Sequence, residues 1–274
     1  MKHLLLPAIT FLFASTSSCR KLIDYIHDNP NAHDSLCRIT RIVVIGAADV
    51  PDTMDVTYNA KGNPIKMAKS NWVYQFVNYD KHFRYDRFDR LTEYITTFAG
   101  TTSVSLWHKY GYPRYNFITD TTMTIGADLN QPTPIATDAY YYYIVGYTID
   151  GLGRIVKHWA MPRAGSGDSA SLITDIVYDA NGNLPLYNAN LKRDDKVNVF
   201  RTNKIWQFIF DDYSLNNAVP KGPSAPAVTY NNFGLPTSYP NLEPYNRLLF
   251  ELRNFSPFMQ IEYACSMPKG PISY

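Results

Sequence analysis

One short turn motif recurs along this chain and limits the folds that it can adopt. An aromatic or apolar residue is followed by Asp or Asn, two variable residues, usually a Gly, a polar residue and then an apolar run. Copies begin at Tyr58, Tyr85, Ile149, Tyr178 and, more weakly, Tyr230. Asp and Asn side chains bond backbone groups two residues further on, and Gly adopts the positive φ that tight turns need. Each copy therefore predicts a β-hairpin.

The spacing of the copies and the aromatic content extend this prediction to the whole chain. The copies start 27, 64, 29 and 52 residues apart, which predicts an irregular repeat and not a strict solenoid. The 22 Tyr, 14 Phe and 4 Trp residues favour strands, because large aromatic side chains cover a half-buried pleated face. We therefore expect an all-β, mainly antiparallel protein with little helix.

Two longer segments also resemble each other. Residues 71–80 and 204–212 each carry a Trp among other aromatic residues and end in an acidic turn, so both are predicted to be strands. This similarity favours two related halves, about 37–135 and 136–265, within one sheet. The best helix candidate is 242–255, where apolar residues recur at helical spacing, although a pair of strands fits it equally well.

The amino-terminal residues read as a leader. After Lys2 comes an apolar run over 4–14, which is too short to span a bilayer but fits a signal peptide over 1–18. The small residues before Cys19 resemble the lipobox of bacterial lipoproteins, which implies cleavage before Cys19 and lipid on its sulfur. Thr16 departs from that pattern, and an ordinary secretory peptide is the alternative. Residues 19–36 are then a polar tether, and 37–274 a single β domain.

The other two cysteines lie near the two ends of the predicted body. Cys37 opens its first strand-like run and Cys265 closes its last one. An even pair in an exported chain predicts a disulfide between them, with two buried free thiols as the alternative.

A family resemblance rests on these features together. The turns 178–183 and 149–154 look like the YD repeats of Rhs-type proteins. With the lipobox-like leader and the two terminal cysteines, the chain resembles small YD-repeat-like lipoproteins of Bacteroidota. The resemblance covers about 37–265. It implies a curved antiparallel meander of hairpins and no enzymatic activity.

We searched the sequence for catalytic and ligand-binding patterns. A formal charge of +2 leaves no basic footprint for nucleic acid. The serine between the two glycines of 164–169 lacks the strand-to-helix context of a nucleophile elbow. The His and Asp residues of 27–34 lie in the tether, and the paired acids at 194–195 and 211–212 read as turn residues, so we expect no metal and no cofactor. A hydrolase whose carboxylates meet only in space remains an alternative.

The remaining candidates are aromatic. We expect an aromatic binding surface for a sugar or a partner protein, with packing in the core and at its rim as the alternative. Its candidates are Trp72, Trp107, Tyr141, Tyr143, Trp159 and Trp206.

The sequence thus predicts a lipid-anchored, non-enzymatic protein of the outer membrane that binds a glycan or an envelope protein. Arg20 and Lys21 after the anchor favour the periplasmic face. A structural part of an outer-membrane assembly is the main alternative.

Overall fold

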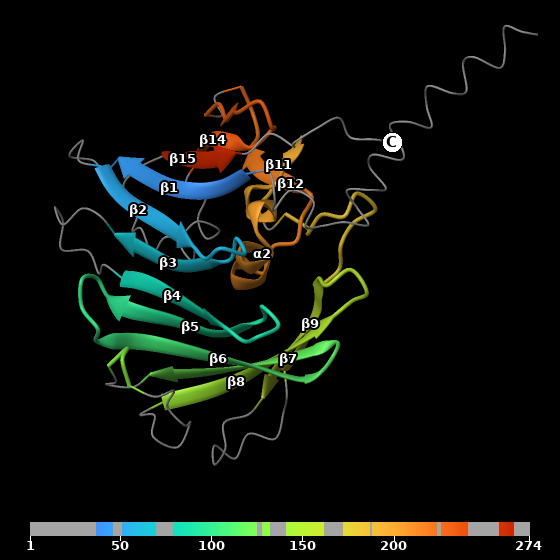
Figure 1. Ribbon diagram of the computed structural model, residues 1–274. Helices are drawn as coiled ribbons and strands as arrows, with labels where there is room; N and C mark the ends of the chain where they lie inside the picture. Colours follow the sequence, from blue (N-terminus) through green and yellow to red (C-terminus); the bar gives the residue numbers. More distant parts are fainter. Residues whose placement is uncertain are drawn as a thin grey trace, which may run out of the picture.

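A single large antiparallel sheet dominates the protein (Figure 1). The computed structural model describes residues 37–45, 51–69, 79–124, 128–131, 141–161, 172–186, 188–223, 226–240 and 258–265. The strands of this sheet are β1 (Cys37–Ile45), β2 (Pro51–Tyr58), β3 (Pro64–Lys69), β4 (Tyr79–Tyr85), β5 (Leu91–Phe98), β6 (Val104–Arg114), β7 (Phe117–Thr124), β8 (Tyr141–Ile149), β9 (Ile155–Met161), β10 (Leu172–Asp175), β13 (Thr229–Tyr230), β14 (Pro236–Pro240) and β15 (Phe258–Cys265).

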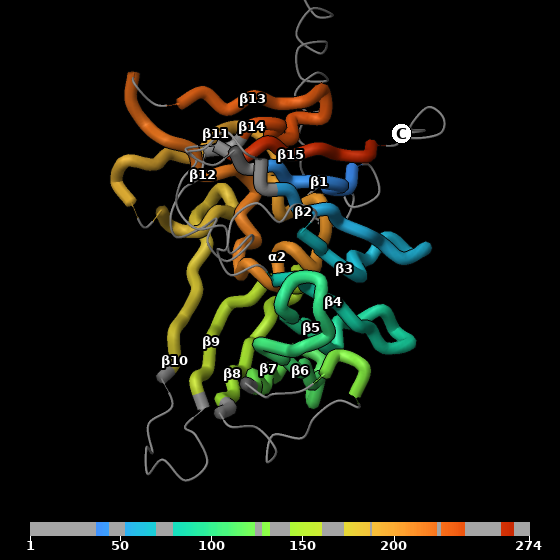
Figure 2. Tube along the Cα trace, turned by 90° about the vertical axis from the view of Figure 1, so that its left-hand side faces the viewer, coloured from blue at the N-terminus to red at the C-terminus, as the bar shows by residue number. Residues whose placement is uncertain are grey.

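The strand order is that of a meander. It runs β10-β9-β8-β7-β6-β5-β4-β3-β2-β1-β15-β14-β13, so the first ten strands pair with their neighbours in sequence and the last three extend the β1 edge. The sheet curves strongly (Figures 1 and 2). The prediction of a mainly antiparallel, curved β meander is confirmed.

Four of the five motif copies connect paired strands, as predicted. They form the β2–β3, β4–β5, β8–β9 and β13–β14 hairpins. The copy that begins at Tyr178 also makes a tight turn, but it leads into 184–186, which has no regular secondary structure. A turn sequence fixes the reversal of the chain, whereas a strand also needs a partner strand beside it.

A compact insertion lies inside the curve of the sheet (Figure 1). It comprises a two-stranded sheet, β11 (Leu191–Val197) with β12 (Asn216–Pro220), the 3-10 helix η2 (Val199–Thr202) and the α-helix α2 (Lys204–Phe210). The prediction of a strand over 204–212 is therefore wrong. Ile205 and Trp206 are adjacent and both buried, which an alternating strand with one exposed face does not allow. The side chain of Asn203 instead caps α2 by accepting a hydrogen bond from the Ile205 backbone N–H.

The main core lies between the concave face of the sheet and this insertion. Ring centroids of Phe83 on β4 and Trp206 on α2 are 5.7 Å apart, and those of Tyr110 on β6 and Phe208 on α2 are 5.0 Å apart. A smaller cluster of Ile95 and neighbouring apolar residues covers the opposite face of β5 to β7. Both faces of the central strands are therefore partly buried.

A disulfide closes the fold between strands far apart in sequence. Cys37 and Cys265 are cross-strand partners on β1 and β15, and their sulfur atoms are bonded across a separation of 228 residues. The predicted bridge is confirmed. The leader, Cys19, the tether, Trp72 and 242–255 lie outside the described residues, and the division into two related halves stays a prediction.

Candidate functional site

The five turns share one hydrogen-bond pattern, which shapes one end of the sheet. In the β8–β9 turn, Oδ1 of Asp150 accepts from the backbone N–H groups of Leu152 and Arg154, each at 2.9 Å. Gly153 completes the turn with a φ of 77°. The equivalent acceptors are Asn59, Asp86, Asp179 and Asn231. Because every acceptor is bonded twice, the turns are held in one local geometry.

Several turns are joined to a neighbouring segment by a tyrosine hydroxyl that donates to a backbone carbonyl beside the turn. The Tyr112 hydroxyl on β6 donates to the Leu91 carbonyl at 2.6 Å, just after the β4–β5 turn, and burial raises the pKa of Tyr112 to about 12. The Arg90 guanidinium lies 4.5 Å above the Tyr112 ring while it pairs with Asp86. Similar hydroxyl–carbonyl bonds join Tyr58 to Ile39, Tyr85 to Pro64, Tyr178 to Ile155 and Tyr263 to Pro236.

The same arrangement recurs at the β8–β9 turn. Arg154 pairs with Asp150 and lies 4.3 Å above the ring of Tyr178, whose hydroxyl donates to the Ile155 carbonyl at 2.9 Å. Two guanidinium groups are thereby held at defined positions at the turn end of the sheet. Each combines an ion pair with a cation–π contact, which restricts a side chain that is otherwise mobile.

Helix α2 faces these turns from inside the sheet. Asn203, at its start, also donates through Nδ2 to the Gly62 carbonyl of the β2–β3 turn at 2.9 Å. At its other end Asp211 adopts a left-handed conformation, and its carboxylate lies 2.8 Å from Nε2 of His158 on β9. The helix is thus bound to the sheet at both ends.

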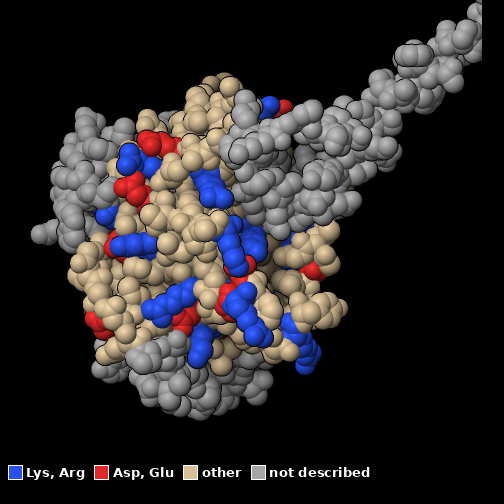
Figure 3. Space-filling model, in the orientation of Figure 1, with Lys and Arg blue, Asp and Glu red and all other residues tan. Residues whose placement is uncertain are grey.

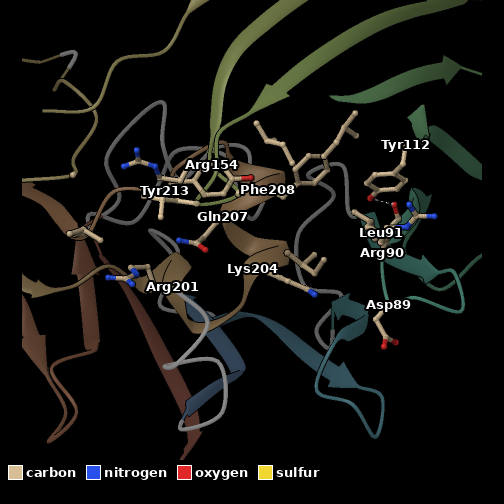
Figure 4. A pocket seen from close by; sticks show the side chains of 17 residues that line it. Asp89, Arg90, Leu91, Tyr112, Arg154, Arg201, Lys204, Gln207, Phe208 and Tyr213 are labelled. Atoms are coloured by element: carbon tan, nitrogen blue, oxygen red, sulfur yellow. Dashed lines mark hydrogen bonds between the residues drawn. The ribbon is translucent and has the colours of Figure 1, made fainter. Parts of the chain in front are cut away.

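A cavity of about 260 Å³ separates α2 from the turns, and we call it the turn-edge cavity. Its walls are mostly apolar, and Figure 4 shows α2 on one side with the Leu91–Tyr112 pair on the other. Its charged and amide side chains are Arg90, Arg154, Arg201, Lys204, Gln207 and Asp89, and Tyr112 and Tyr213 add hydroxyl groups. On the face drawn in Figure 3, Lys and Arg side chains lie near the middle with Asp and Glu side chains among them. The cavity is mostly apolar, and four of the five charged side chains in its lining are cationic.

A buried polar network lies deeper on the concave face. Nδ1 of His108 lies 3.0 Å from Oδ2 of Asp120 and 3.0 Å from Oγ1 of Thr122, and the Tyr147 hydroxyl donates to Asp120 at 3.4 Å. In a catalytic triad the carboxylate and the nucleophile meet opposite nitrogens of the imidazole. Here both groups meet the same nitrogen, so this arrangement is not a triad.

The structure buries two residues of the predicted aromatic surface and exposes another. Trp107 and Trp206 are 0% and 1% exposed, so neither contributes to a surface, and that prediction is wrong for both. The large indoles fill the two cores instead, because they bury the most apolar area. Trp159 is half-buried, with Nε1 donating to Thr148. Tyr143 is exposed on β8, while the side chain of Tyr141, like all of Trp72, lies outside the described residues.

The cavity residues were not among the predicted site residues. A sequence signal existed, since Arg90 and Arg154 occupy the final position of two motif copies. Their meeting with α2 depends on contacts between distant segments, which no local pattern reveals.

Comparisons with known proteins add little to this description. No family model and no curated protein matches the chain. Among solved structures, a porin-like protein from Bacteroides uniformis is 9% identical, with 83% of this chain and 98% of that chain covered and a TM-score of 0.27. A likeness at that score carries no argument about function.

Within the described ranges, no helix has the length and apolarity to cross a membrane. Nor does this part of the chain bring together three or more side chains able to ligate a metal ion.

Proposed function

We propose that this protein is a lipid-anchored binding protein of the cell envelope, with no catalytic role, that holds a glycan or a partner protein's side chain in the turn-edge cavity. The cavity carries the proposal. Clefts with apolar walls and a few convergent polar groups are the usual form of small-ligand sites. Two of its charged groups, Arg90 and Arg154, are held by ion pairs and cation–π contacts before any ligand arrives, which lowers the entropic cost of binding.

Anchoring rests on the leader and Cys19. Small residues before a cysteine, after a short apolar run, support lipidation and export to the outer membrane. The five equivalent turns support kinship with the small YD-repeat-like lipoproteins. Cys19→Ala should move the protein from the membrane fraction to the soluble fraction. Retention in the membrane fraction would contradict the anchor.

The binding role is tested by filling the cavity. Leu152 lines it from the fourth position of the β8–β9 turn, so Leu152→Trp should occupy the space and abolish binding. Phe233 holds the same position in the β13–β14 turn and lines a different, shallow depression, so Phe233→Trp is the matched control. The full chain, purified in detergent, is screened against a glycan panel. The glycan-binding role fails if no glycan binding depends on the Leu152 substitution.

Protease shaving of intact cells then separates the two classes of partner. Digestion would place the protein outside the cell, where glycans and host proteins are accessible. Survival until the outer membrane is broken would favour an envelope protein as the partner.

A further inference from the structure

Most charges in the turn-edge cavity are paired. Asp89 pairs with Lys61, whose Nζ lies 2.7 Å from its Oδ2, and Arg90 and Arg154 pair with Asp86 and Asp150. Lys204 is the cation of the lining for which the described residues supply no carboxylate. A ligand that enters the cavity therefore meets one ammonium group without a counter-ion.

The two turn arginines keep donors for a ligand. Arg90 uses Nε and Nη2 on Oδ2 of Asp86, and Arg154 uses the same two nitrogens on Oδ2 of Asp150. In each guanidinium the two N–H groups of Nη1 lie beyond this pair. Both arginines line the cavity, so a second acceptor can bind without breaking either ion pair.

Helix α2 presents two further polar groups, one turn apart. Lys204 is exposed, and no ion pair or hydrogen bond of its Nζ is found within the described part of the chain. Gln207 is 5% exposed, lines the cavity, and its side-chain amide likewise finds no partner among the described residues. Figure 4 shows both side chains extending from α2. Neither amide atom is fully enclosed, so both can exchange water for a ligand that offers a donor and an acceptor.

We propose that the turn-edge cavity binds one carboxylated sugar residue, with its carboxylate on Lys204 and its hydroxyls on Gln207. This inference rests on the proposed binding function. The apolar walls, including Phe208, suit the C–H face of a sugar ring. At about 260 Å³ the cavity lies below the range of roughly 300–1,000 Å³ typical of drug-sized ligands, so it fits one residue or the end of a chain.

Other ligand classes fit less well. A long acyl chain exceeds the volume and leaves the Gln207 amide without a partner. A neutral sugar satisfies that amide but leaves Lys204 without a counter-ion. A carboxylated sugar satisfies both.

The test compares D-galacturonate with D-galactose, which differ only at C6, by isothermal titration of the full chain in detergent. We expect galacturonate to bind at least tenfold more tightly. Lys204→Met should lower its affinity about tenfold and leave galactose unchanged, since charge-assisted hydrogen bonds are the stronger ones. Lys192, exposed on β11 and outside the lining, gives the control Lys192→Met, which should change neither. Gln207→Glu adds a negative charge and should remove galacturonate binding.

Three results would overturn the inference. They are equal affinity for the two sugars, an effect of Lys204→Met no larger than that of Lys192→Met, and tighter binding of a sugar phosphate than of D-galacturonate and D-glucuronate. If a neutral glycan binds and Leu152→Trp abolishes that binding, the proposed function stands while this inference fails. If no ligand responds to Leu152→Trp, both fail.

Discussion

Removing one hydroxyl group tests whether the tyrosines that fasten the turns stabilise the fold. Tyr112→Phe deletes the donor to the Leu91 carbonyl, while the ring beneath Arg90 remains. Leu91 is 2% exposed, so its carbonyl gains little from water when the hydroxyl is lost. A buried acceptor that loses its partner costs about 1–3 kcal/mol, and the carbonyl's second lone pair favours the lower half of that range. We expect a loss of about 1.5 kcal/mol of unfolding free energy.

Urea denaturation of Tyr112→Phe measures this loss as a lower midpoint at an unchanged slope. Tyr115, which is 95% exposed at the β6–β7 turn, provides the control Tyr115→Phe, with an expected change within about 0.5 kcal/mol. Tyr112→Leu also removes the ring under Arg90 and should cost about 0.5–1 kcal/mol more. If Tyr112→Phe and Tyr115→Phe unfold at the same urea concentration, the hydroxyl–carbonyl bond contributes nothing and the reasoning is wrong.

Three further predictions concern the covalent link, the turns and alkaline pH. Replacing both Cys37 and Cys265 by Ala should lower the unfolding free energy by about 2–5 kcal/mol, because the bridge closes a loop of 228 residues; an unchanged urea midpoint would contradict this. Gly153→Ala should lower the unfolding free energy by about 1 kcal/mol, because a φ of 77° disfavours alanine even though the space around Gly153 is open. Asp89→Gly, at the equivalent turn position, should be neutral within about 0.5 kcal/mol or stabilising. Burial raises the pKa of Tyr112 to about 12, so between pH 10 and 12 the unfolded chain loses this proton first, and this group alone lowers the unfolding free energy by about 1.4 kcal/mol per pH unit. Burial also raises the pKa of Tyr85, Tyr147 and Tyr178, which lower it further. An equal midpoint at pH 9 and pH 11 would refute that sign.

Local chemistry explains why the turns and most strands were predictable from the sequence. The carboxylate of Asp150 bonds backbone groups two and four residues away, so the signal lies within one short window. Asp86 makes the same turn with Asp89 in the place of Gly, at a φ of 61°. The disulfide was predictable for a different reason, because the proposed lipid anchor takes one of the three cysteines and leaves a single pair.

The insertion was not predictable, because its position depends on contacts between distant segments. Residues 204–212 share aromatic composition with a strand-like segment, and composition alone does not separate a short buried helix from a strand. Asn198 and Asn203 cap η2 and α2 and so favour helix over strand, but in the sequence they look like any other polar residues. The residues of the candidate site were not predicted for the same reason, since β5, β6, the β8–β9 turn and α2 meet only in the folded chain.

The position of the cavity follows from the architecture. A sheet this strongly curved encloses an interior that must be filled, and the insertion between β10 and β13 fills it. Its largest side chain, Trp206, packs against the middle of the sheet, where Phe83 lies. At the turn end, the paired arginines cannot pack into an apolar core without losing water or their carboxylates, so the filling stops short of them. The space that remains has apolar residues on both sides, with Lys204 and Gln207 on α2 and the paired arginines at the turns, and the proposed ligand, a ring with an acidic group, matches this lining.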